Sequence, residues 1–196
     1  MLQHERKNQR FAGRTMLTVA CVLSPGGIYN HTHVERLKKM VQKNMRQEYN
    51  FVCVEDSPFS GFWAKISLFE PRRFQGRVLY LDLDVTVKGN LDDLANHQGQ
   101  FMIVKDWFRF GFNSSIMAWD AGIADHIYLD YVAENCPKIK GGDQSYIMQK
   151  MPSAHIFPRN WVQSFKKACF DGGFMPDLRV IAFHGFPKPW QLTDFT

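Results

Sequence analysis

The sequence predicts a single α/β domain with a mixed, mostly parallel central sheet. Strand-like and helix-like patterns alternate through the first half of the chain, which is typical of βαβ units. The polar residues best suited to chemistry follow strand-like runs, and in parallel sheets ligands bind beyond the carboxyl ends of the strands. The chain has 196 residues, 45% hydrophobic and 22% charged, which suits one globular domain. We expect the domain to span residues 16–196, after a flexible basic arm at residues 1–15.

The first elements are expected to be a strand, a helix, a second strand and a short helix. The strands run from Met16 to Leu23 and from Phe51 to Val54, and the short helix lies around Trp63–Phe69. Between the strands, Thr32-His33-Val34-Glu35 has the form of a capping box that opens the longer helix. The apolar residues of that helix fall on one face: Val34, Leu37, Val41 and Met45.

The run from Gly76 to Val85 is the most informative part of the chain. Apolar residues lead directly into Asp82 and Asp84, so we expect a buried strand with both carboxylates on one side. At about 4 Å and an effective dielectric of about 20 their repulsion would be roughly 4 kcal/mol, which a divalent cation removes. Oxygen ligands of this kind suit Mn²⁺ or Mg²⁺. A strand-end turn with solvated acids is the alternative interpretation.

The second half of the chain carries further elements and three more candidate groups. We expect strands at residues 101–104, 115–119, 154–157 and 179–183, and helices at 121–135 and 143–150. Asn113 and Ser114 could bind a polyol, or could simply be polar residues at a sheet edge. The pair Gly141-Gly142 would let backbone approach a ligand beside Asp143 and Gln144, or Asp143 could be a helix N-cap.

The last candidate group is the segment His184–Trp190, which follows the final strand. His184 could be a third metal ligand, and Lys188 could neutralise a phosphate. A proline-rich terminal turn is the alternative. The net charge of +5 suits an anionic partner without choosing one. The polar N-terminus and the absence of a long apolar run predict neither a secretory leader nor a membrane span, and the four widely spaced cysteines fit the cytoplasm.

Taken in order, these segments resemble GT-A glycosyltransferases, and family 8 with its glycogenin and lipopolysaccharide galactosyltransferase relatives in particular. The resemblance extends from Met16 to about Trp190, and a small group of phage and bacterial proteins with a Phe-His-Gly-x-Pro-Lys-Pro ending looks closer still. The segments that carry it are Trp63-Ala64-Lys65, Tyr80-Leu81-Asp82-Leu83-Asp84, Phe112-Asn113-Ser114-Ser115, Gly142-Asp143-Gln144 and His184–Trp190. The chain departs from family 8 in the spacing of His184 and Lys188, which are four residues apart where six is usual.

The resemblance implies a metal-dependent, retaining transferase that moves a sugar from a UDP-sugar to an acceptor hydroxyl. We expect it in the cytoplasm, or in the host cytoplasm if a phage encodes the chain. It assigns Mn²⁺ (or Mg²⁺) to Asp82, Asp84 and His184. Donor contacts would come from Ser24, Lys65, Asp82, Asn113, Ser114, Gly185 and Lys188. Asp143 and Gln144 would lie near the anomeric carbon as catalytic residues.

The acceptor is left open between a saccharide or lipid-linked glycan and a hydroxymethylated pyrimidine in phage-type DNA. Two other functions also remain. Asp82-Leu83-Asp84-Val85-Thr86 fits the D-x-D-x-T pattern of a HAD-type phosphatase, although two strands precede it. A non-catalytic basic module that binds nucleic acid would use the surface lysines and arginines. The donor sugar and the oligomeric state are not predicted.

Overall fold

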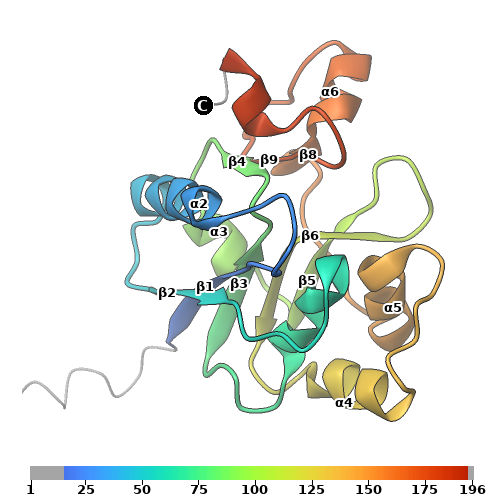
Figure 1. The fold of residues 1–196 in the computed structure, drawn as a ribbon. Coiled ribbons are helices and arrows are strands. Elements are labelled where there is room, and N and C mark those ends of the chain that lie inside the picture. The colour runs from blue at the N-terminus through green and yellow to red at the C-terminus, as the bar shows by residue number, and fades with distance from the viewer. Residues whose placement is uncertain (1–15, 194–196) are drawn as a thin grey trace, which may run out of the picture.

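The computed structural model describes residues 16–193, so the predicted arm at 1–15 lies outside the described residues. Its elements, labelled in Figure 1, follow in this order: β1 (Leu17–Val22), α2 (His31–Asn44), β2 (Asn50–Val54), the 3-10 helix η1 (Gly61–Phe69), β3 (Arg77–Leu81), β4 (Val85–Val87), α3 (Asp92–Ala95), β5 (Phe101–Lys105), β6 (Phe112–Asp120), α4 (Asp125–Ala133), α5 (Gly142–Lys150), β7 (His155–Ile156), β8 (Val162–Ser164), α6 (Phe165–Asp171), β9 (Val180–Ala182) and the 3-10 helix η2 (Pro189–Gln191).

A six-stranded sheet with the order β2-β1-β3-β6-β5-β7 forms the centre of the molecule. Its β1 strand pairs in parallel with both β2 and β3, and β5 pairs in parallel with β7. Only β6 runs against its neighbours β3 and β5. The sheet is therefore mixed and mostly parallel, which confirms the predicted fold class. A second sheet of three short strands, β4-β9-β8, lies beyond its carboxyl edge (Figure 1).

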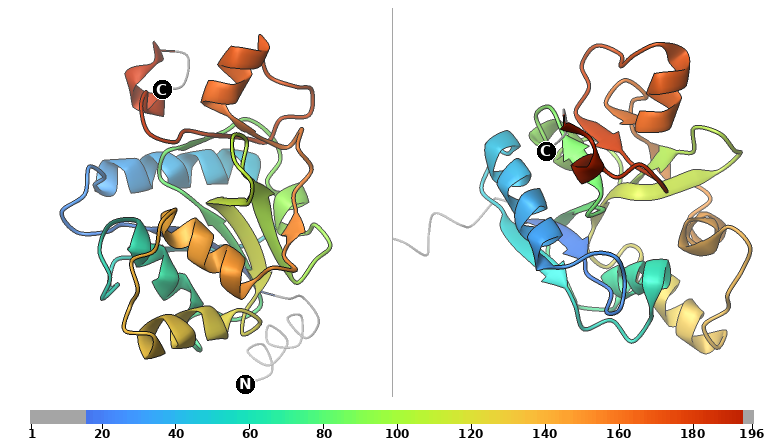
Figure 2. Two further views of the ribbon diagram at one scale, coloured as in Figure 1. Left: turned by 90° about the vertical axis from the view of Figure 1, so that its right-hand side faces the viewer. Right: turned by 45° about the horizontal axis from the view of Figure 1, so that its top comes forward.

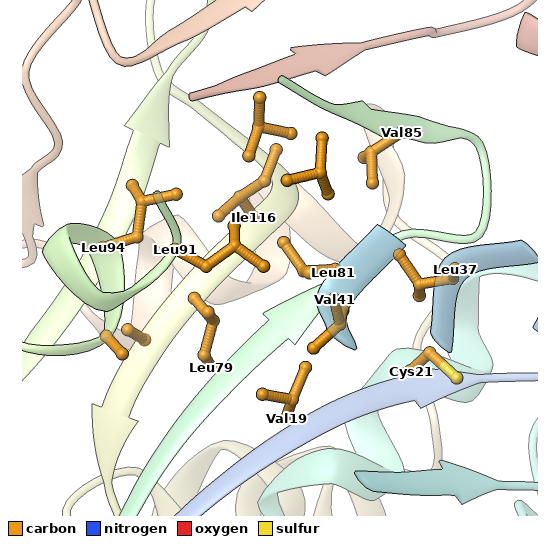
Figure 3. Close-up of a cluster of buried hydrophobic side chains, with 14 of the residues drawn as sticks. Val19, Cys21, Leu37, Val41, Leu79, Leu81, Val85, Leu91, Leu94 and Ile116 are labelled. Atoms are coloured by element: carbon orange, nitrogen blue, oxygen red, sulfur yellow. The ribbon is translucent and has the colours of Figure 1, made fainter. Parts of the chain in front are cut away.

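Helices cover both faces of the large sheet (Figure 2). The helix α2 packs on one face, and η1, α4 and α5 pack on the other. The alternation of side chains along β3 separates the two cores, because Leu79 and Leu81 belong to the α2 side while Val78 and Tyr80 belong to the other. Figure 3 shows the α2 core, where Leu37 and Val41 meet Val19 of β1 and Leu81 of β3.

Three local predictions are wrong. The N-cap of α2 is Asn30, whose side chain accepts from the backbone of Thr32, and its reciprocal partner is His33 rather than Glu35. The strand before the acidic pair ends at Leu81, since Asp82 to Asp84 form a turn that passes into β4 of the second sheet. The helix predicted over 121–135 is the shorter α4.

Besides β4 and the 3-10 helix η2, three elements were not predicted from the sequence: α3, β8 and α6. Both helices are short, with four and seven residues, and β8 has three residues. Segments of this length contain too few residues to show a hydrophobic period. Within residues 16–193, no helix is both long and apolar enough to cross a membrane.

Candidate active site

A cavity of about 710 Å³ opens at the carboxyl ends of β1 and β3. Every residue that the sequence singled out for the site lines it: Ser24, Lys65, Asp82, Asp84, Asn113, Ser114, Asp143, Gln144, His184, Gly185 and Lys188. These residues come from six separate stretches of the chain. The structure thus brings the candidates together, while the role of each stays a prediction.

Asp82 lies on the η1 and α5 side of the cavity. Its carboxylate accepts from Lys65 Nζ at 2.9 and 3.0 Å and from the Tyr80 hydroxyl at 2.5 Å. Tyr80 is two residues earlier on β3, and strand alternation places it on the same side as Asp82. Burial, together with the Asp82 charge, raises the pKa of Tyr80, so the phenol stays protonated and donates.

Asp84 lies across the turn, against a different cation. Its Oδ2 accepts from Lys188 Nζ at 2.5 Å and from the Tyr29 hydroxyl at 2.9 Å. Burial and the neighbouring Asp82 charge raise the pKa of Asp84, while Lys188 opposes that shift. The Asp82 carboxylate is thus near enough to Asp84 to disfavour its ionisation.

Lys65 joins the strand end to α5. Its ammonium is 3.1 Å from Ser114 Oγ and 3.7 Å from Asp143 Oδ2, in addition to its contacts with Asp82. Burial lowers the pKa of Lys65, but the Asp143 and Asp82 charges outweigh burial and raise it overall, so the ammonium stays charged.

Asp143 is buried in the first turn of α5, and its Oδ2 accepts from Ser114 Oγ at 2.6 Å. The N-cap of that helix is Gly141, in a left-handed conformation with φ 92°, so the capping role for Asp143 is wrong. A Cβ on Gly141 would lie 2.0 Å from Ser145 Oγ, and one on Gly142 would lie 2.8 Å from the Phe62 ring. The glycine pair thus allows the tight entry that turns Asp143 into the cavity.

His184 forms the opposite wall. Its Nε2 is 2.6 Å from Ser164 Oγ, and its ring stacks on Trp107 with centroids 5.8 Å apart and planes 13° apart. Burial, with the nearby Lys166 charge, lowers the pKa of His184. The ring is therefore neutral at pH 7, which is the form that binds metals.

The donor set fits a hard divalent cation, although the three side chains are not gathered around one point. No group of three His, Cys, Asp or Glu residues within 16–193 is close enough to hold a metal ion. Two carboxylates and a neutral imidazole nevertheless line one cavity, and each carboxylate already binds a cationic group. Three aspartates against two lysines leave the lining with one negative charge, which a divalent cation would reverse.

The remaining candidates form the rim and floor. Ser24, at the end of β1, accepts from the backbone of Gly61 at 2.9 Å. Asn113 is buried and accepts from the backbone of Ser115 at 3.0 Å. Gly185 is exposed, with φ +72°, directly after His184.

Sequence analysis missed two phenols that bind the acids. Tyr80 could have been found, because the strand predicted up to Val85 contains both Tyr80 and Asp82, and alternation puts them on one face. Tyr29 could not, because it lies in the irregular segment before α2, 55 positions from Asp84, and no periodic pattern marks it.

Searches of family models and of curated proteins match nothing. Solved structures do match. The apo form of the glycosyltransferase GlyE from Streptococcus pneumoniae TIGR4 aligns with a TM-score of 0.64 and 15% identity, covering 90% of this chain and 56% of that one. LgtC, a galactosyltransferase solved with donor and acceptor sugar analogues, aligns with a TM-score of 0.57 and 16% identity. The alignment covers 92% of this chain and 91% of that one.

A third structural neighbour is a glycosyltransferase involved in glycosylation of the major capsid of PBCV-1. It aligns with a TM-score of 0.60 and 13% identity, covering 85% of this chain and 92% of that one. The chain spans a little over half the length of GlyE. At identities this low the structural likeness shows the fold alone: the chain has the GT-A glycosyltransferase fold.

Proposed function

We propose that the chain is a metal-dependent glycosyltransferase that moves a sugar from a UDP-sugar to an acceptor hydroxyl. The observation that carries the proposal is the single cavity that holds every predicted site residue in a GT-A fold. We include in this proposal that the chain is related to family 8, and most nearly to its phage and bacterial subgroup. We also propose that transfer retains the anomeric configuration and that the protein acts in the cytoplasm, or in the host cytoplasm if a phage encodes the chain.

Charge is the main argument for a metal. A UDP-sugar brings a diphosphate, and a lining with one excess negative charge would repel it. Asp82, Asp84 and His184 would hold Mn²⁺ or Mg²⁺, which supplies positive charge to the diphosphate leaving group. Lys188, released from Asp84, is then free to bind a phosphate oxygen.

The residues around Asp143 suit the sugar end of the donor. Ser114 and Asn113 supply a hydroxyl and an amide for sugar hydroxyls, and Lys65 fixes the Asp143 carboxylate. Asp143 and Gln144 would stabilise the positive charge that develops on the anomeric carbon. In the front-face step, the bond from that carbon to the diphosphate breaks, the acceptor oxygen bonds to the carbon, and the acceptor proton passes to the diphosphate.

Two other functions receive less support. The three neighbours above are all glycosyltransferases, which favours a transferase over a HAD-type phosphatase that would use Asp82 as its nucleophile. A non-catalytic nucleic-acid module does not explain why three buried or half-buried aspartates and two lysines face one cavity.

The test is mass spectrometry after incubation of the full chain with Mn²⁺, a panel of UDP-sugars and candidate acceptors. We expect transfer, or slow hydrolysis, with one donor, which names the sugar, and loss of both with EDTA. The absence of UDP binding by calorimetry in Mn²⁺, together with hydrolysis of an aryl phosphate, would overturn the proposal in favour of the phosphatase.

A further inference from the structure

A second cavity, of about 430 Å³, lies on the other side of the His184 wall. Trp107 and Ser164 line it, and both contact His184, which lines the first cavity. The two cavities therefore share a wall in which His184 contacts Trp107 and Ser164. The second is built from the end of β5, from β8 and from α6 with the loop that follows it.

Gln163 of β8 lines this second cavity and has a donor that lacks a partner. The residue is 7% exposed, and its Oε1 accepts from the backbone of Met175 at 3.1 Å, which fixes the orientation of the amide. Its Nε2 is buried and has no acceptor among residues 16–193. A buried amide donor without an acceptor is unfavourable, so the site favours a ligand with a hydroxyl or carbonyl oxygen.

The rest of the lining suits a neutral polyol with apolar faces. Trp107 and the buried Phe157 supply aromatic surface. Charges of both signs lie beside these rings, since Lys105, Arg159 and Lys167 are basic while Asp106 and Asp171 are acidic, and Lys167 pairs with Asp171. A mixed lining of this kind offers donors and acceptors to the hydroxyls of a sugar ring.

The β5–β6 loop connects the second cavity with the sugar end of the first. Asp106 lines both the second cavity and a small hollow of about 50 Å³ on the other side of the loop. Gln144 and Gly141 line that hollow and the first cavity as well. A chain of sugar units following this loop would therefore have polar and aromatic contacts along its whole path.

We propose that the second cavity is a subsite for one ring of an oligosaccharide acceptor, remote from the ring that receives the transferred sugar. This inference rests on the proposed function and commits the acceptor to a saccharide. The orphaned amide of Gln163 donates to a ring hydroxyl, and Trp107 packs against the ring.

The direct test is NMR of the full chain with UDP and Mn²⁺, titrated with a panel of neutral, amino and acidic di- and trisaccharides. The Gln163 side-chain amide and the Trp107 indole are assigned with Gln163→Met and Trp107→Phe. We expect one class of saccharide to shift both signals. Its KM as acceptor should rise about 3- to 10-fold in Gln163→Met, the loss expected for one hydrogen bond.

The rate of UDP-sugar hydrolysis without acceptor should be unchanged in Gln163→Met. Gln100→Met, an exposed glutamine at the opposite end of β5, should change neither quantity. If the wild type turns over a UDP-sugar but no saccharide shifts either signal, the subsite is overturned. The same follows if a hydroxymethylated oligodeoxynucleotide shifts them instead. If UDP neither binds nor is released from a donor, the proposed function fails, while saccharide binding can still be measured.

Discussion

Lys188 and Lys65 each neutralise one aspartate of the acidic pair, and this pairing determines how the site should respond to a metal. The Asp84 side chain is 8% exposed and that of Lys188 is 7% exposed, so their contact lies out of water. Each acid is paired with a lysine of its own, so the repulsion between the two carboxylates is partly offset before any metal binds. A metal ion that binds here would therefore replace an existing positive charge rather than fill a purely anionic site.

Replacing Lys188 tests this exchange. Lys188→Met leaves Asp84 buried with Tyr29 as its remaining partner, which should cost about 3 kcal/mol of unfolding free energy without metal. Because Mn²⁺ would restore the missing charge, it should raise the melting temperature of the variant more than that of the wild type. Thermal unfolding with and without Mn²⁺ measures the difference. Lys43→Met, an exposed lysine of α2, is the control, and equal Mn²⁺ shifts in all three proteins would show that Lys188 and the metal do not share Asp84.

Asp84→Asn should remove metal-dependent transfer. The amide keeps the shape of the side chain and can still contact Tyr29, but it loses the charge that would hold a cation. We expect the transfer rate to fall roughly 100-fold or more, with the circular dichroism spectrum unchanged. Asp93→Asn changes an acid that lies outside the cavity and pairs with Arg179, so it serves as the matched control. Full Mn²⁺-dependent activity in Asp84→Asn would take this carboxylate out of the mechanism.

At the scale of elements, the N-cap of α2 differs from the one that the sequence predicted. Asn30 caps the helix in the structure, whereas the pattern Thr32-x-x-Glu35 suggested Thr32. Asn30→Ala should lower the free energy of unfolding by about 1 kcal/mol, because the backbone donor of Thr32 loses its acceptor. Thr32→Ala should change it by less than about 0.5 kcal/mol. Urea unfolding of both variants decides between them, and the opposite ranking would restore the cap predicted from sequence.

Elements with a repeating hydrophobic pattern were predictable, and those defined by tertiary contacts were not. Val34, Leu37 and Val41 recur at helical spacing and are buried as expected. The end of β3 was misplaced because Leu83 and Val85 continue the apolar run, although the chain turns at Asp82 and enters another sheet. Asp82, Asp84 and His184 could be named because they follow strand-like runs, whereas Lys65 was assigned only through the resemblance to family 8. The pairing of Lys65 and Lys188 with the two acids could not be predicted, because Lys188 and Asp84, for example, are 104 positions apart.

Over the whole molecule, the C-terminal segment that carries Lys188 into the cavity lining packs against the start of α2. Trp190 in η2 has its ring 4.2 Å from that of His33 and 5.9 Å from that of Tyr29, measured between centroids. Lys188 reaches Asp84 from the same segment, and its ammonium also lies 2.9 Å from the Tyr29 hydroxyl. The aromatic contacts at α2 therefore fix the position from which Lys188 acts.

Trp190→Ala should loosen this segment without unfolding the sheets, because η2 lies outside both of them. We expect faster hydrogen exchange over residues 184–192 and a UDP affinity about 3- to 10-fold weaker, the loss expected for one aromatic contact. Trp190→Phe keeps a ring against His33 and should retain most of the affinity. Exchange by mass spectrometry and UDP calorimetry in Mn²⁺ provide the two measurements. If exchange accelerates while UDP affinity stays unchanged, donor binding does not depend on how this segment docks, and Lys188 would have no part in holding the diphosphate.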